Sequence, residues 1–156
     1  MPSPLELGIA RGEIDARLIE PGVPTPTAPD AAAALGVEPG QIIKSLLFTD
    51  GDGGVVLAIL SGASRVDRAR LAATTGHRRL KMAPADVVLA RTGYPAGGTP
   101  PVGHIEPLPV VLDARVAAMA VVYGGGGRVD SLLEIRPGEI LRVTGATVAD
   151  IADASG

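Results

Sequence analysis

The stretch IIKSLLFTDGDGGVVLAILS, residues 42–61, predicts a β-hairpin. Residues 42–50 and 55–61 are two runs of mainly Ile, Leu and Val, which are typical of strands. Between them, GDGG at 51–54 supplies glycines for the positive φ angles of a tight hairpin turn. The second run is apolar up to Ser61, so we expect its strand to be buried on both faces. The hairpin must then belong to a sheet that is covered on both sides.

The segments on either side of this hairpin alternate between strand-like and helix-like patterns. We expect further strands at residues 14–19, 78–83, 108–113, 119–124 and 131–135. We expect helices at residues 30–36, 66–76 and 84–92, and two helical tail segments at 137–145 and 147–154. Because the order has no regular strand–helix–strand repeat, the expected fold class is α/β (α+β). We expect a single domain, residues 1–156, with a curved, partly barrel-like mixed sheet surrounded by helices.

The composition indicates an aliphatic core. Of 156 residues, 46% are hydrophobic, but none is Trp, and the aromatic residues are Tyr94, Tyr123 and Phe48. The chain has no cysteine, which excludes disulfides, thiolate nucleophiles and Cys-based zinc sites. No apolar run reaches the about 20 residues of a membrane span, and MPSPLELGIARGE at the N-terminus lacks the pattern of a secretory signal. We therefore expect a soluble, cytoplasmic protein with no membrane partner.

Lys44 is the first candidate for a functional residue. Side chains two apart in a strand share a face, so Lys44 shares one face with Ile42 and Leu46. An ammonium among apolar neighbours is costly unless it meets an anion or a cavity. In the functional interpretation, this lysine points into a ligand pocket. The structural alternative is an edge-strand lysine that prevents aggregation, or one whose charged end reaches solvent at the rim of the sheet.

The stretch GYPAGGTPPVGH, residues 93–104, is the second candidate. It contains four glycines and three prolines, and His104 is its only titratable residue besides one tyrosine. Glycine lets a backbone approach a ligand closely, and proline fixes φ and removes N–H groups. The remaining N–H donors are few and pre-oriented, so they can serve a carbonyl oxygen, an oxyanion or a phosphate. The structural alternative is a stiff surface connection.

Familiar catalytic motifs are missing from the sequence. GQIIKS lacks the glycine spacing of a P-loop, and GGGGR at 124–128 lacks that of a dinucleotide-binding turn. His77 and His104 have no spacing that supports a metal site, and no serine lies in a GxSxG context. We expect no metal and no cofactor. If the protein is a hydrolase, we expect water to attack the substrate directly.

Charge is unevenly distributed along the chain. The net charge is −3, but residues 65–91 contain seven Lys or Arg residues and two Asp residues. A basic segment in an acidic protein is typical of a surface that faces an anion. The alternative is that these residues are the solvated faces of a helix and a strand, and the sequence favours neither interpretation.

Five segments of the chain follow the order of the motifs of a known family. They are IIKSLLF at 42–48, ARTGY at 90–94, GGTPPVG at 97–103, LPVVLD at 108–113 and GGGGR at 124–128. Together they resemble the YbaK family of prolyl-tRNA editing-related domains. The resemblance covers Ala31 to Ile151. Its most specific part is the lysine strand combined with the G-x-x-x-P loop, Gly97 to Pro101.

The resemblance implies a small α/β domain with a bent mixed sheet. It implies a freestanding aminoacyl-tRNA deacylase that hydrolyses the ester of a mischarged small amino acid on the acceptor end of tRNA (trans-editing). By the resemblance, Lys44 is the residue needed for activity. The implied substrate-binding residues are Gly97, Gly98, Thr99, Pro100, Pro101, Gly103, Gly125 and Gly126. Candidate accessory residues are His104, Tyr94, Asp130 and Ser131, and candidates for tRNA contact are Arg65, Arg68, Arg78, Arg79 and Lys81.

The chemistry of ester hydrolysis fits these residues. Hydrolysis builds negative charge on the carbonyl oxygen, which backbone N–H groups of the 97–103 loop can hold. Lys44 can anchor the terminal phosphate or ribose, or polarise the carbonyl, and a vicinal ribose hydroxyl can orient the attacking water. We expect Lys44 to face the loop across one pocket.

Two departures from the family pattern leave the substrate open. RLIEPGVPT at 17–25 lacks the tyrosine or histidine of some relatives, and Asp130 and Ser131 stand where some members have Leu-Asp. Because these positions shape the amino-acid pocket, the resemblance does not say which amino acid is removed. Two other functions stay open. One is a non-catalytic module that binds aminoacyl, nucleotide or tRNA ligands and docks to an aminoacyl-tRNA synthetase, and the other is hydrolysis of a small non-tRNA ester.

Overall fold

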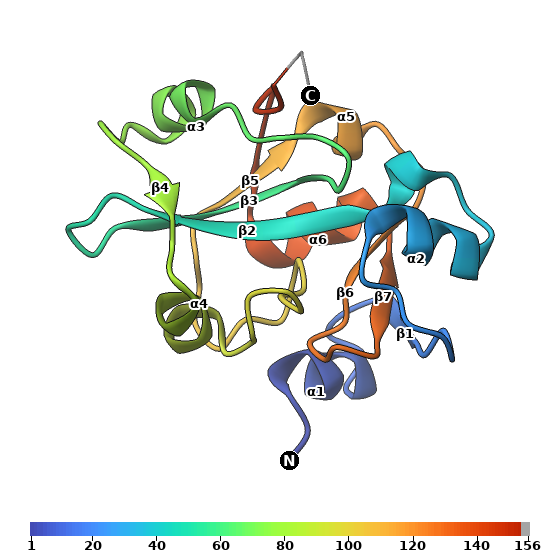
Figure 1. Ribbon diagram of the computed structural model, residues 1–156. Helices are drawn as coiled ribbons and strands as arrows, with labels where there is room; N and C mark the ends of the chain where they lie inside the picture. Colours follow the sequence, from blue (N-terminus) through green and yellow to red (C-terminus); the bar gives the residue numbers. More distant parts are fainter. Residues whose placement is uncertain (154–156) are drawn as a thin grey trace.

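The predicted hairpin is formed by β2 (Ile43–Thr49) and β3 (Val55–Ser61), which pair antiparallel. The computed structural model describes residues 1–153 (Figure 1). Its larger sheet has five strands in the order β4-β2-β3-β5-β8. The other strands are β4 (Lys81–Met82), β5 (Val110–Asp113) and β8 (Thr147–Ala149). Because β5 is parallel to both β3 and β8, whereas β2 is antiparallel to its neighbours, the sheet is mixed, as predicted.

A second sheet has three antiparallel strands in the order β1-β7-β6. They are β1 (Ala16–Ile19), β6 (Val122–Gly125) and β7 (Leu132–Ile135). One parallel bridge, between Ile42 and Tyr123, connects it to the start of β2. The α/β (α+β) class is confirmed. The strands of the described residues form two sheets joined by this single bridge, so their pairings do not close into the partly barrel-like sheet that we expected.

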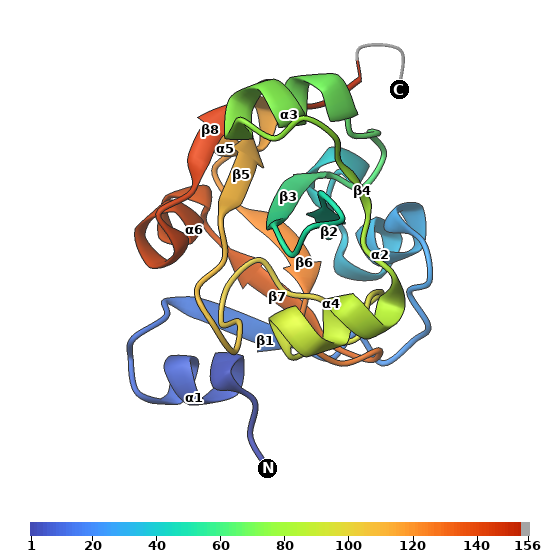
Figure 2. The same cartoon turned by 90° about the vertical axis from the view of Figure 1, so that its left-hand side faces the viewer.

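Helices cover both sides of the larger sheet (Figure 2). α3 (Arg68–Thr75) lies on one side, and α4 (Ala85–Thr92) and α1 (Pro4–Ala10) lie on the other. The remaining helices are α2 (Ala28–Leu35), α5 (Ala114–Ala117) and α6 (Pro137–Thr144), and a 3₁₀ turn, Pro39–Gln41, precedes β2. Gly36 and Gly76 end α2 and α3 at φ angles of 70° and 80°, a left-handed conformation that suits glycine. Within residues 1–153, no helix is long and apolar enough to cross a membrane.

β3 lies in the core, with residues 55–60 all buried, which confirms the prediction of a strand covered on both faces. Its side chains alternate between two hydrophobic clusters. Leu57 and Ile59 belong to the larger cluster, whereas Val56 and Ala58 belong to the cluster beneath α3. Full burial of one such large aliphatic side chain contributes about 1.5–3 kcal/mol. Packing on both faces therefore fixes the position of the hairpin that carries Lys44.

Some stretches differ from the sequence-based expectation. The tail at 147–154 is not a helix, because residues 147–149 form β8 beside β5; residue 154 lies outside the described residues. The open edge of β5 offers backbone partners, and helix propensity is a weak competing effect. The strand expected at 78–83 is reduced to residues 81–82, and α1 and α5 have no counterpart in the prediction.

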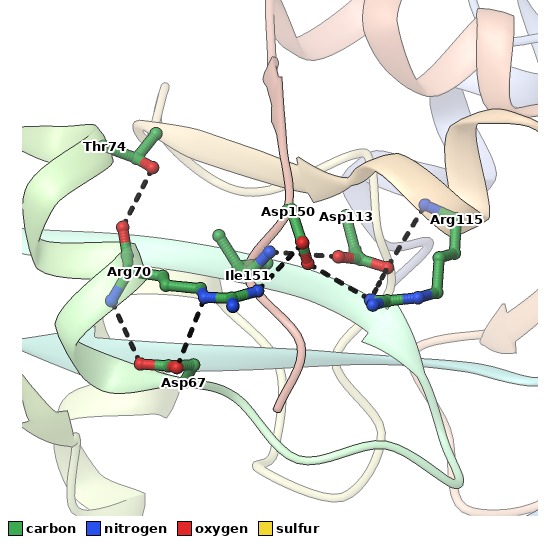
Figure 3. A network of polar contacts seen from close by, with 7 residues as sticks. All are labelled: Asp67, Arg70, Thr74, Asp113, Arg115, Asp150 and Ile151. Atoms are coloured by element: carbon green, nitrogen blue, oxygen red, sulfur yellow. Dashed lines mark hydrogen bonds and ion pairs between the residues drawn. The ribbon is translucent and has the colours of Figure 1, made fainter. Parts of the chain in front are cut away.

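A network of charged side chains ties α3 to β5 and β8 (Figure 3). Arg70 Nη1 in α3 donates to Asp150 Oδ2 at 2.8 Å, and Arg115 Nη1 donates to Asp150 Oδ1 at 3.3 Å. Asp113 is buried, and it accepts hydrogen bonds from the backbone N–H groups of Arg115 and Ile151. The network holds in place the helix that also carries Arg68.

Candidate active site

Lys44 leaves β2 toward the 62–66 segment that follows β3. Its Nζ donates to the carbonyl oxygen of Ser64 at 2.5 Å and to that of Gly62 at 3.3 Å. The cavity beside it has a volume of about 260 Å³ and is lined by Lys44, Leu46, Phe48, Arg65, Val66, Arg68 and Met82. Burial, and then the nearby charge of Arg65, lower the pKa of Lys44 below its ordinary value. An ammonium has three N–H groups, so one stays available for a ligand.

The 97–103 loop lies on the other side of β2 from the 62–66 segment (Figure 1). A Cβ on Gly124 would contact both Ile43 and Pro101, so this proline packs on the face of β2 that Ile43 occupies. Lys44 points to the opposite face, because successive side chains of a strand alternate. The cavity that Lys44 lines contains no residue of the loop. The expectation that Lys44 faces the loop across one pocket therefore differs from the observed arrangement.

The loop packs on β6, and β6 meets the start of β2 just before Lys44. Lys44 and Gly125 each follow the Ile42–Tyr123 bridge by two residues, so both lie shortly beyond the point where the two strands meet. A Cβ on Gly125 would lie 2.8 Å from the carbonyl oxygen of Thr99, closer than real side chains approach. The loop backbone thus rests on β6 at Gly125, and only glycine fits there.

The loop carries free backbone donors. Residues 98–102 are buried. Prolines leave five N–H groups between residues 97 and 103, and within the described residues only that of Gly98 has an acceptor. Buried N–H groups without a partner are rare in folded proteins. Thr99 and Val102 are buried, and their N–H groups have no acceptor within the described residues.

Two side chains hold the loop through its carbonyl groups. The buried Tyr94 hydroxyl donates to the carbonyl oxygen of Gly103 at 2.6 Å and accepts the N–H of Leu5 at 3.0 Å. His104 Nε2 lies 2.7 Å from the carbonyl oxygen of Pro100, so the proton of this hydrogen bond sits on Nε2. Burial lowers the pKa of His104, and the hydrogen bond to Pro100 opposes that shift. The carbonyls of Pro100 and Gly103 therefore have partners, whereas the N–H groups of Thr99 and Val102 have none within the described residues.

The glycine turn after β6 packs against the loop without room for side chains. Gly127, at a φ of 89°, donates its N–H to the carbonyl of Gly98 at 3.0 Å. A Cβ on Gly126 would lie 2.4 Å from Ser131 Oγ. Ser131 is buried, and its Oγ has no hydrogen-bond partner within the described residues, whereas Asp130 is exposed. Of these two candidates, the structure brings only Ser131 against the turn.

The five candidates for tRNA contact are all exposed. Four of them, Arg68, Arg78, Arg79 and Lys81, line one cavity of about 600 Å³. Arg65 lines the smaller cavity of Lys44, and Arg68 lines both. The two cavities are therefore neighbours that share one arginine.

Helix α1 is the part of this region that the sequence analysis missed. A Cβ on Gly103 would lie 2.7 Å from Leu5 Cα, so the start of α1 presses directly on the end of the loop. Glu6 also pairs with Arg128, which follows the glycine turn. The available signal was the pair Ser3 and Glu6, whose spacing is that of a capping box and which forms one here.

The histidines lie in different parts of the molecule. His77 Nδ1 is 3.1 Å from Asp50 Oδ2 at the hairpin turn, whereas His104 contacts the loop. Across residues 1–153, no group of three or more His, Asp or Glu side chains is placed so as to hold a metal ion. The described polar groups around the loop are its backbone donors and the side chains of Tyr94, His104 and Ser131.

The chain belongs to the aminoacyl-tRNA editing domain family. The family model described as "Aminoacyl-tRNA editing domain" matches residues 23–143, which include Lys44, the loop and the glycine turn. The resemblance derived from the sequence motifs is thereby confirmed. Helix α1 lies outside the matched residues.

Relatives of two kinds share this domain. The Enterococcus faecalis (strain ATCC 700802 / V583) protein named "Putative Cys-tRNA(Pro)/Cys-tRNA(Cys) deacylase EbsC" is 29% identical over 80% of this chain and 76% of that protein. The proline–tRNA ligase of Geobacter sp. (strain M21) is 34% identical over 67% of this chain, which corresponds to 18% of the ligase. A structure described as "a putative trans-editing enzyme for prolyl tRNA synthetase" matches with a TM-score of 0.86 and 36% identity, over 99% of both chains.

Proposed function

We propose that the protein is an aminoacyl-tRNA deacylase that removes a mischarged small amino acid from tRNA in trans. The observation that carries this proposal is the 97–103 loop, in which the N–H groups of Thr99 and Val102 have no acceptor within the described residues, whereas the carbonyls of Gly98, Pro100 and Gly103 have partners. Membership of the aminoacyl-tRNA editing family supports the same reaction. EbsC and the solved trans-editing protein are both matched over most of their length, which supports activity apart from a synthetase chain.

The loop is suited to the charge that develops during ester hydrolysis. Water adds to the ester carbonyl carbon, and the carbonyl oxygen becomes an oxyanion. The bond to the ribose oxygen then breaks, the ribose hydroxyl regains a proton from the attacking water, and the free amino acid and tRNA leave. N–H groups of Thr99 and Val102 are proposed to hold the oxyanion, an interaction worth about 3–4 kcal/mol per donor in other enzymes. A vicinal ribose hydroxyl is proposed to orient the water.

Lys44 is proposed to anchor the terminal phosphate or ribose rather than to polarise the ester carbonyl. The sequence left both roles open. Its side chain points away from the face on which Pro101 packs, and its Nζ is held by two carbonyl groups with one N–H remaining. A cation that holds the nucleotide beside Gly125 would deliver the ester to the loop. Charge-assisted hydrogen bonds of this type contribute about 1.5–3 kcal/mol.

The amino-acid pocket is proposed to lie at the glycine turn, with Gly125, Gly126 and Ser131 at its wall. The Ser131 hydroxyl is buried and unpaired within the described residues, so it can hydrogen-bond to a small polar substrate. EbsC is named for cysteine on tRNA(Pro) and tRNA(Cys), which makes Cys-tRNA(Pro) the first substrate to test.

A synthetase is proposed as a second partner, and the cytoplasm as the place of the reaction. The support is that proline–tRNA ligases contain a related segment, and that a solved relative is described as acting for prolyl tRNA synthetase. Charged tRNA is used in translation, so an editing protein must meet it in the same compartment.

A deacylation panel tests the proposal. The protein is incubated with Cys-, Ala-, Ser- and Thr-charged tRNA, and loss of the ester is followed over time. We expect at least one ester to be hydrolysed. If every ester survives, the proposed reaction is wrong, and saturable tRNA binding without turnover would instead support a non-catalytic binding module.

A Lys44 variant tests the anchoring role. Lys44→Met keeps an aliphatic stem but removes the charge, and we expect kcat/KM to fall about 10- to 100-fold. Arg136→Ala is the control, because Arg136 is exposed and pairs with Asp15 in another part of the molecule. If Lys44→Met hydrolyses the ester as fast as the unaltered protein, this role is wrong.

A further inference from the structure

The cavity between α3, β4 and the hairpin turn gathers positive charge from separate segments. α3 contributes Arg68, the turn before β4 contributes Arg78 and Arg79, and β4 contributes Lys81. The cavity has a volume of about 600 Å³; β4 pairs with the end of β2, and α3 lies above this end of the sheet (Figure 1). Like charges brought this close repel one another, so the arrangement favours a bound anion.

These four cations have no ion pair within residues 1–153, although carboxylates are near. Asp50 lines the same cavity, but it accepts the N–H groups of Asp52 and Gly54 and contacts His77. The hydrogen bonds of Asp50 therefore stabilise the hairpin turn rather than the cations of the cavity. On the other side of α3, Arg70 is paired with both Asp67 and Asp150. The free charges are thus confined to the cavity side of the helix.

The cavity leads toward Lys44. Arg68 lines both the large cavity and the small one that contains Lys44 and Arg65. Positive groups therefore follow one another from Arg78 and Arg79 through Arg68 to Lys44. This row is a property of the tertiary structure, since the residues come from β2, α3 and the 78–81 segment.

We propose that the large cavity binds the phosphates of the RNA strand whose 3′ end is held at Lys44. The proposal rests on the proposed deacylase function, and it adds a direction: the strand enters over residues 78–81, passes Arg68 and ends beside the 97–103 loop. Exposed cations from three segments suit a flexible chain of phosphates better than one small anion, which needs convergent donors. Each phosphate contact releases counterions, so binding must weaken as salt rises.

Two substrates of different length separate this cavity from the catalytic site. One is full-length aminoacyl-tRNA, and the other is the same amino acid esterified to adenosine, which has no phosphate for the large cavity to bind. For Arg78→Ala/Arg79→Ala we expect the KM for aminoacyl-tRNA to rise about fivefold or more at 0.15 M salt, with kcat unchanged. We expect no change with aminoacyl-adenosine. The control, Arg17→Ala/Arg136→Ala, removes the same charge from residues paired with Glu134 and Asp15.

Binding of uncharged tRNA tests the cavity even if no ester is hydrolysed. We expect the slope of log Kd against log salt to fall by about 0.7–0.9 for each phosphate contact removed. An unchanged slope and affinity in Arg78→Ala/Arg79→Ala would overturn the proposal while leaving the deacylase intact. The proposal is also wrong if inorganic phosphate or a mononucleotide binds the cavity as tightly as tRNA, because the site would then be one for small anions.

Discussion

Arg68 and Arg70 lie two residues apart on α3 and show two uses of the same side chain. Arg70 faces the network of Figure 3, where Asp67 and Asp150 neutralise it. Arg68 faces the two cavities and has no carboxylate partner within the described residues. Paired cations hold elements together, whereas a fold that leaves cations unpaired and clustered keeps them for a ligand.

The backbone of the loop repeats this contrast. Tyr94 and His104 pair two of its carbonyls, and the N–H groups of Thr99 and Val102 have no acceptor in the part of the chain that the structure describes. In most of a fold, buried donors find partners. Both of these groups, the cations around Arg68 and the loop N–H groups, lie on the route that we propose for tRNA. The following substitutions test whether groups with a partner serve stability and groups without one serve the reaction.

The largest effect is expected for Tyr94→Phe. It leaves the buried N–H of Leu5 and the carbonyl of Gly103 without their shared partner, so we expect a loss of about 1–3 kcal/mol in the free energy of unfolding. Because the loop is then less well held, kcat should fall while the Kd for tRNA stays constant. Urea unfolding and deacylation kinetics measure the two effects.

Tyr123→Phe is the matched control for this change. The Tyr123 hydroxyl donates to Glu134 at 3.0 Å, away from the loop. Its removal should affect stability but not kcat. If kcat falls equally in both variants, the hydroxyl of Tyr94 has no special role in positioning the loop.

A smaller effect, dependent on pH, is expected at Glu139. Hydrogen bonds from Arg142, and then from the backbone of Asp15, lower its pKa to about 2. Since the folded value lies below the ordinary 4.5, its contribution to stability is present above about pH 4.5 and is lost as the pH falls toward 2. The exposed arginine partner is screened by water, so we expect Glu139→Gln to cost about 1–2 kcal/mol at pH 7.

Urea titrations at pH 7 and pH 2.5 measure this difference. We expect the difference in the free energy of unfolding between Glu139→Gln and the unaltered protein to become smaller at the lower pH. Glu13→Gln makes the same charge change at an exposed position without an ion pair in the described residues. It should unfold with the same free energy as the unaltered protein at both pH values. If the stability loss caused by Glu139→Gln is the same at pH 7 and pH 2.5, the charge of the paired carboxylate is not the cause of that loss.

The smallest expected effect, and the most direct test, comes from replacing each of the two arginines of α3 by alanine in turn. Arg70→Ala should lower the free energy of unfolding by less than about 1 kcal/mol and leave the KM for aminoacyl-tRNA unchanged. Arg68→Ala should leave stability unchanged and raise that KM about threefold. The two variants differ only in which face of one helix they alter. Equal effects on KM would remove the distinction between paired and unpaired cations.

Much of this arrangement was predictable from local sequence. The hairpin, the buried β3 and most helix ends follow from apolar runs and from glycines such as Gly36 and Gly76. β8 was not predictable, because its strand conformation depends on the edge of β5, far away in the sequence. For the candidate site, the residue types and the motif order predicted Lys44, the loop and the glycine turn, and their roles stay predictions. The opposite directions of Lys44 and Pro101 became evident only once β2 and β6 were placed together.

By itself the sequence determined which groups are available: one lysine in an apolar strand, a loop of glycine and proline, and a basic segment. Those features depend on neighbours along the chain, where side-chain alternation and φ preferences act. Only the tertiary structure decided which of those groups are free. Arg70 meets Asp150 across 80 residues of sequence, and Tyr94 meets Leu5 across 89, so pairing is settled by long-range packing. Arg68 and the N–H groups of Thr99 and Val102 are free because no such partner reaches them within the described residues.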